Sequence, residues 1–142
     1  MRQGKLTDAL DTYNEGHSVR EALVGRDPAN AGWQRDLSIS YEKIGYVQLA
    51  KGDLMNALNA YKKGLAIREA LVVRDQANIQ WQLDVAILCS NLGVHALVPM
   101  DEQRVYLLRG LEIQQRLKDR NQLPPNQDHI EWFQKRLKKF DS

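Results

Sequence analysis

Residues 52–99 read GDLMNALNAYKKGLAIREALVVRDQANIQWQLDVAILCSNLGVHALVP, and residues 4–51 read GKLTDALDTYNEGHSVREALVGRDPANAGWQRDLSISYEKIGYVQLAK. The two stretches align without a gap, and 21 of their 48 positions are identical. Agreement of this extent indicates an internal duplication, which is typical of stacked structural units. A weaker third copy covers about residues 100–122, because GLEIQQRLKDR from Gly110 resembles GLAIREALVVR from Gly64 at a shift of 46 residues.

Each copy has the residue spacing of α-helices. Leu54, Leu58 and Tyr61 recur at the i, i+4, i+7 positions that share one helical face. The Gly52-Asp53 pair is typical of a glycine stop followed by the N-cap of the next helix, and no run of alternating apolar and polar residues indicates a strand. The pattern therefore predicts an all-α chain, with helices at residues 5–25, 31–50, 54–74, 79–97, 102–120 and 128–140.

The repeat resembles the tetratricopeptide family, whose pattern is W-x2-L-G-x2-Y followed by A-x3-F. Residues 41–48 read Tyr-x2-Ile-Gly-x2-Gln, residues 57–61 read Ala-x3-Tyr, and residues 89–96 read Cys-x2-Leu-Gly-x2-Ala. The resemblance implies a single domain over residues 1–142, built as a solenoid of antiparallel helix pairs. The unit here is longer than the family's 34 residues by about two turns per helix, and is similar to long-helix arrays of bacterial proteins.

The last predicted helix, residues 128–140, has the pattern of a cap on the solenoid. Its apolar residues form one stripe, and its basic residues fall on the other side. The stripe consists of Ile130, Phe133, Leu137 and Phe140. Four basic residues within 135–139 also fit a nucleic-acid surface, but the solvated side of a capping helix explains them more simply.

Composition limits the classes of protein and of partner. Residues 1–75 carry 11 basic and 10 acidic side chains, and residues 76–142 carry 9 and 8. Neither half has the excess of positive charge that nucleic-acid binding requires, and no apolar run is long enough to span a membrane. The N-terminus lacks the apolar region of a signal peptide, and a single cysteine fits a reducing compartment. We therefore expect a cytoplasmic protein that binds neither nucleic acid nor membrane.

No group of residues predicts catalysis, a cofactor or a metal. His17, His95 and His129 fall on different predicted helices, without the spacing of a metal site. Cys89 replaces a bulky core residue of the motif, which predicts a buried and inert thiol. Asp36 and Asp84 recur in both copies, and recurrence favours a structural role over acid–base chemistry. The expected entries are therefore no catalytic residue, no cofactor and no metal ligand.

A helical interaction surface is the predicted site. In tetratricopeptide arrays the first helix of each pair lines a concave groove, and from Gln76 to Met100 the only formal charge is Asp84. Two interpretations stay open: this segment is buried between neighbouring helices, or it forms an apolar groove for a peptide or helix. Trp33 and Trp81 are either core anchors or contacts to a partner. The resemblance implies a groove floor made of Ile39, Glu42, Tyr46, Leu49, Ile87, Ser90, Val94 and Leu97.

The resulting hypothesis is a non-catalytic protein-interaction module or scaffold. A carboxylate clamp of the family's chaperone-binding type is not expected, because only Lys43 and Asn91 have suitable side chains at the matching positions. A regulatory or oligomerisation segment of a larger signalling protein or enzyme is the main alternative, and a nucleic-acid-binding helical repeat is a weaker one. We also expect either a longer array around this chain or self-association through the N-terminal helix, whose apolar face has Leu6, Leu10, Tyr13 and Leu23.

Overall fold

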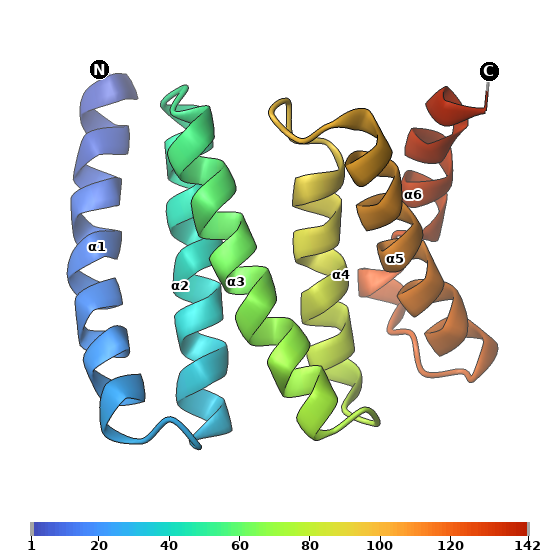
Figure 1. Cartoon of the computed structure of the whole chain (residues 1–142), viewed down its shortest axis with the longest axis horizontal. Helices are drawn as coiled ribbons and strands as arrows, with labels where there is room; N and C mark the ends of the chain where they lie inside the picture. Colours follow the sequence, from blue (N-terminus) through green and yellow to red (C-terminus); the bar gives the residue numbers. More distant parts are fainter. Residues whose placement is uncertain (1, 142) are drawn as a thin grey trace. The chain divides into compact units, whose positions relative to one another are not determined.

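The computed structural model describes residues 2–141, and this part of the chain contains helices and no strand. The all-α prediction is therefore confirmed (Figure 1). Six α-helices follow one another along the chain, and short 3-10 helices, η1 and η2, flank the last of them. In order, the elements are α1 (Arg2–Arg26), α2 (Ala31–Ala50), α3 (Leu54–Arg74), α4 (Ile79–Gly93), α5 (Met100–Asp119), η1 (Pro125–Gln127), α6 (Ile130–Leu137) and η2 (Lys138–Phe140).

Packing divides the chain into two compact units. Unit 1 ends at Leu71 in the last turns of α3, and unit 2 begins at Val72. In unit 1, α1 packs along α2, and side chains of α3 contact α2. In unit 2, α4 and α5 form an antiparallel pair, and α6 packs against α5 (Figure 1). Among the described residues, no helix has both the length and the apolar character needed to cross a membrane.

Asparagine side chains cap the first turns of α2 and α4. The backbone N–H of Trp33 donates to Asn30 Oδ1 at 3.0 Å, and that of Trp81 donates to Asn78 Oδ1 at 3.0 Å. Such a side-chain acceptor satisfies a backbone donor that the first turn leaves open. Before α3, Gly52 has a φ of +84°, a left-handed conformation that glycine adopts without a steric cost. The predicted glycine stop is therefore confirmed.

In unit 1, side chains of α3 contact α2 at two places. Gly45 lies against the ring of Tyr61, which is 2% exposed. Burial raises the pKa of Tyr61 to about 12, with a further contribution from the nearby Glu42 carboxylate. Arg68 is also 2% exposed and bridges α3 to two side chains of α2. This helix pair thus combines close packing over a glycine with a buried polar bridge.

Unit 2 has its core between α4 and α5 and beneath α6. Gly93 lies against the side chain of Leu107, and Gly110 lies against the ring of Phe133. Cys89 is 1% exposed, which confirms the predicted burial of its thiol. In the predicted cap, Ile130 and Phe133 are buried, while Leu137 and Phe140 are half-buried. The apolar stripe of this segment therefore packs inward as predicted.

The prediction for the end of the fourth helix is wrong. The predicted helix extended to residue 97, but α4 ends at Gly93. Turns follow, in which the His95 N–H donates to the Leu92 carbonyl and the Leu97 N–H donates to His95 Nδ1 at 3.1 Å. The buried side chain of Gln103 donates to the His95 carbonyl at 2.8 Å. A contact from α5 thus stabilises the turn, and glycine has a low helix propensity at the end of α4.

Candidate functional site

An apolar pocket in unit 2 is the candidate site. Its volume is about 390 Å³, which lies in the range of pockets that hold small ligands or single anchoring side chains. Residues of α4, α5 and α6 line it, together with His129 just before α6. Most of the surface that they contribute is apolar, and three polar side chains interrupt it. The lining residues are Ala86, Ile87, Ser90, Gln114, His129, Trp132 and Phe133.

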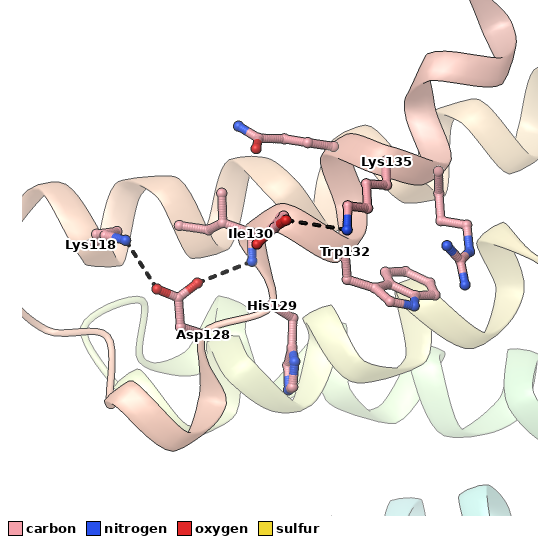
Figure 2. A pocket seen from close by; sticks show the side chains of 9 residues that line it. Lys118, Asp128, His129, Ile130, Trp132 and Lys135 are labelled. Carbon is pink, nitrogen blue, oxygen red and sulfur yellow. Dashed lines mark hydrogen bonds and ion pairs between the residues drawn. The ribbon is translucent and has the colours of Figure 1, made fainter.

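Hydrogen bonds position the wall that comes from the start of α6. The Gln114 side chain donates from Nε2 to the Gln127 carbonyl at 3.0 Å and accepts from the His129 N–H at 2.6 Å. Asp128 accepts from the Ile130 N–H at 3.1 Å and from Lys118 Nζ at 3.0 Å. Figure 2 shows Asp128 between these two donors. The segment that carries His129 is therefore anchored to α5 through two side chains.

The carboxylate of Asp128 also stabilises the first turn of α6. Its pKa is lowered, first by the hydrogen bond from the Ile130 N–H and then by the hydrogen bond from Lys118. An ionised acceptor at this place satisfies a backbone donor that the helix itself leaves open. The start of α6, and with it one wall of the pocket, thus depends on a charged side chain.

A wider hollow of about 890 Å³ adjoins the apolar pocket. The two cavities share His129 and Trp132, whose side chains lie on the same side of the first turn of α6 in Figure 2. The guanidinium carbon of Arg136 lies 4.7 Å from the centre of a Trp132 ring, within the range of a cation–π contact. Five charged side chains are among those that line the hollow, three cations and two carboxylates: Lys118, Lys135, Arg136, Asp128 and Glu131.

The four residues of the predicted groove floor in unit 2 lie in two different places. Ile87 and Ser90 line the apolar pocket. Val94 and Leu97 do not belong to α4, since they lie in the turns that follow Gly93. They are 44% and 43% exposed. The early end of α4 is thus the physical reason why two of the four predicted residues leave the helical surface.

In unit 1 the predicted floor residues have different environments. Tyr46 and Leu49 are 68% and 41% exposed, so their side chains are accessible. Ile39 and Glu42 are half-buried. The Glu42 carboxylate lies 2.8 Å from the guanidinium of Arg68, which makes it part of the polar bridge between α2 and α3. Trp33 and Trp81 are half-buried as well, which agrees with neither full core burial nor full exposure.

Sequence reasoning missed three residues of the pocket, namely Gln114, His129 and Trp132. Trp132 falls outside the apolar stripe of its helix, and an aromatic residue on the polar side of an amphipathic helix is a signal that points to a surface contact. Gln114 falls at the position of Arg68 when the third copy is aligned at its shift of 46. His129 has no signal in the sequence, because only the packing of α6 against α5 brings it to the pocket.

Unit 1 contains one other group of chemically active side chains. His17 Nδ1 lies 2.9 Å from Ser40 Oγ, and His17 Nε2 lies 3.4 Å from a carboxylate oxygen of Glu21. The order hydroxyl, imidazole, carboxylate is that of a nucleophilic triad. Ser40, however, is buried in the middle of α2, where the neighbouring N–H groups belong to the helix ladder and do not form an oxyanion site. The geometry therefore fits a structural hydrogen bond.

No metal centre emerges from the part of the chain that the structure describes, where no three His, Cys, Asp or Glu side chains come together. Comparisons with protein-family models, with curated proteins and with solved structures find no match.

Proposed function

We propose that this chain is a non-catalytic protein-interaction module, a tetratricopeptide-like helical repeat with extended units, which binds a peptide or a helix of a partner protein. The apolar pocket of unit 2 is the observation that carries this proposal. Two residues of the predicted groove floor, Ile87 and Ser90, line it. An apolar pocket beside a hollow lined with charged side chains has the composition that anchor sites of protein interfaces share, with an apolar centre and polar surroundings.

The chemistry of the pocket supports binding rather than catalysis. Its polar groups are an amide, a hydroxyl and an imidazole. The amide of Gln114 is used in holding the segment before α6, and the Ser90 hydroxyl donates to the Ile87 carbonyl at 2.5 Å. Neither group is paired with a base within the pocket, as an activated nucleophile would be. The wall contributed by Trp132 and Phe133, whose rings meet edge to face with centres 5.2 Å apart, favours contact with an apolar side chain.

A selection from a library of displayed peptides tests this function. We expect the full chain to select peptides that bind through the pocket. Ser90→Phe places a bulky side chain in the pocket and should abolish their binding. The matched control is Asn59→Phe, which adds the same side chain at an exposed position of α3 and should leave binding unchanged.

Two results would contradict the proposed function. One is a selection that enriches no peptide, and the other is a set of selected peptides that bind the Ser90→Phe variant as tightly as the parent chain. Thermal unfolding of both variants accompanies the binding measurement. If Ser90→Phe does not fold, Trp132→Ala replaces it, because this change removes a wall of the pocket from a half-buried position.

A further inference from the structure

The buried polar bridge of unit 1 can be compared with the pocket of unit 2. Arg68 Nε donates to Ser38 Oγ at 3.0 Å, and its terminal nitrogen donates to Glu42 Oε1 at 2.8 Å. The side chains of Ser38 and Arg68 are almost fully buried, at 0% and 2% exposure. In unit 1, therefore, the space between the two helices of this pair is filled by a guanidinium, a carboxylate and a hydroxyl.

The α4–α5 pair of unit 2 is the structural counterpart of the α2–α3 pair of unit 1. Gly45 contacts Tyr61 across the first pair, and Gly93 contacts Leu107 across the second. The first helices of the two pairs, α2 and α4, correspond at a shift of 48 residues, and the second helices, α3 and α5, correspond at a shift of 46. These are the two shifts of the sequence repeat. A contact that recurs at both shifts shows that residues can be compared position by position between the two pairs.

At the positions of the bridge, unit 2 has smaller or uncharged side chains. Ala86 stands where unit 1 has its serine, Ser90 where it has its glutamate, and Gln114 where it has its arginine. All three line the apolar pocket. The pocket thus lies where unit 1 has its polar bridge, and the Gln114 side chain is turned to the segment before α6 instead.

The remaining walls determine what fits into this space. Ile87, Trp132 and Phe133 are apolar, and both charges of the bridge are missing from the pocket. A charged side chain that enters would lose its hydration without gaining an opposite charge, which is costly. An aromatic or large aliphatic side chain gains free energy from burial against these walls.

The surface beside the pocket has an excess of positive charge. Lys118 and Lys135 are paired with Asp128 and Glu131, at 3.0 and 3.2 Å. Among the described residues, Arg136 has no acidic partner, and it lies over Trp132 at the boundary of the two cavities. Lys138 and Lys139 follow on η2. The guanidinium of Arg136 is suited to a carboxylate, because its donors match that group in pairs.

From these observations we infer that the α4–α5–α6 pocket binds one aromatic or large aliphatic side chain of an acidic peptide segment, of which a flanking carboxylate lies at Arg136. This inference rests on the proposed function and specifies the partner. The apolar side chain supplies burial, and the carboxylate supplies the orientation and the charge complementarity that make the contact specific.

Synthetic fluorescent peptides are the probes that test the inference against the full chain. The reference peptide has one central phenylalanine flanked by glutamates, and its variants replace the phenylalanine by alanine, or all glutamates by glutamines or by lysines. We expect the reference peptide to bind at least about tenfold more tightly than each variant. Salt should weaken its binding, because exposed charge pairs are screened.

Variants of the protein test the charged part and the apolar part of the contact separately. Arg136→Glu should weaken binding of the acidic peptide by at least about tenfold and leave the glutamine peptide almost unaffected. The matched control is Lys62→Glu on α3, which changes the same charge at an exposed position and should have little effect. Ser90→Phe should weaken the binding of both peptides.

Each contrary outcome points to a different failure. Equal binding of the acidic and the glutamine peptides, or library-selected peptides that need the pocket but carry no acidic residue, would overturn this inference and leave the proposed function in place. An acidic peptide that keeps its affinity for the Ser90→Phe variant would overturn the anchor. A single-stranded oligonucleotide that binds more tightly than the peptide, and is unaffected by Ser90→Phe, would show that the cations form a nucleic-acid surface instead.

Discussion

Gly93 of α4 lies in contact with Leu107 of α5, so close that a β-carbon on the glycine would stand 2.6 Å from the leucine side chain. The same relationship joins Gly45 to Tyr61 in unit 1, where a β-carbon would stand 2.7 Å from the ring. Both glycines of the repeated motif therefore lie where the helices of a pair touch. The two helices of each pair approach closely at this position because the glycine has no side chain there.

Adding a methyl group at the glycine of unit 2 should therefore destabilise the protein. We expect Gly93→Ala to lower the free energy of unfolding by roughly 1–3 kcal/mol, because the contact with Leu107 becomes overpacked. The matched control is Gly25→Ala in α1, where nothing lies within 4 Å of the added carbon, and stability should stay unchanged or rise by less than about 1 kcal/mol. Chemical denaturation measures both changes. Equal effects of the two substitutions would show that the contact carries no energetic weight.

The buried bridge of unit 1 should respond unequally to the loss of its two charges. The Arg68 side chain is 2% exposed, whereas that of Glu42 is 32% exposed. Glu42→Ala should cost about 3 kcal/mol, because it removes the carboxylate beside a desolvated guanidinium. Arg68→Met should cost less, since the remaining carboxylate still reaches water.

Denaturant titration of the two variants measures this difference. Glu131→Gln serves as the control, because it breaks an ion pair with Lys135 in which both side chains are largely exposed, and such pairs contribute little to stability. A larger loss for Arg68→Met than for Glu42→Ala would contradict the assignment of the desolvation cost to the guanidinium.

Stability should depend on pH through His17. Burial lowers the pKa of His17 below its usual 6.5; Glu21 opposes this effect, whereas Arg20 and Lys63 add to it. The unfolded chain then binds a proton more readily than the folded chain does. Stability from the neutral ring is thus fully present above about pH 6.5 and declines as pH falls through the lowered pKa.

The second copy of the repeat suggests the variant that tests this pH dependence. Leu65 and Leu88 occupy the positions that correspond to His17 and Ser40. We expect the double variant His17→Leu/Ser40→Leu to lose part of the stability change that the parent chain shows between about pH 7 and about pH 5. These two pH values lie on either side of the ordinary histidine pKa of about 6.5. The control is Ser18→Leu at an exposed position of α1, which removes no titratable group and should keep the pH profile. An unchanged profile in the double variant would assign the pH dependence to other groups.

The N-terminal helix should promote self-association. Among the described residues of α1, none is buried, and Leu6, Leu10, Tyr13 and Leu23 are half-buried. Partly exposed apolar side chains along one helix favour contact with a second copy. We expect light scattering to show a mass that rises with concentration, and Leu10→Glu to abolish the rise.

A matched substitution on the same helix controls for added charge. Thr12 is exposed, and Thr12→Glu should leave self-association intact. A mass that stays monomeric across the concentration series in the parent chain would contradict the prediction.

The sequence by itself determined the helices and most of their ends. The repeat and the helical spacing predicted six helices, and Asn30, Gly52 and Asn78 mark their ends, because capping and left-handed turns depend on a few neighbouring residues. Gly45 and Gly93 also recur at the repeat shift of 48 residues. These features are local or periodic, and for that reason they can be read along the chain.

Tertiary structure alone decided where the pocket lies. Gln103 donates from α5 to the His95 carbonyl in the turns that follow α4, and Val94 and Leu97 lie in these turns and not on the predicted helix. His129 and Trp132 reach the pocket because Gln114 anchors the segment that carries His129. Such contacts join residues that are distant in sequence and follow no period, since side-chain packing between helices determines them.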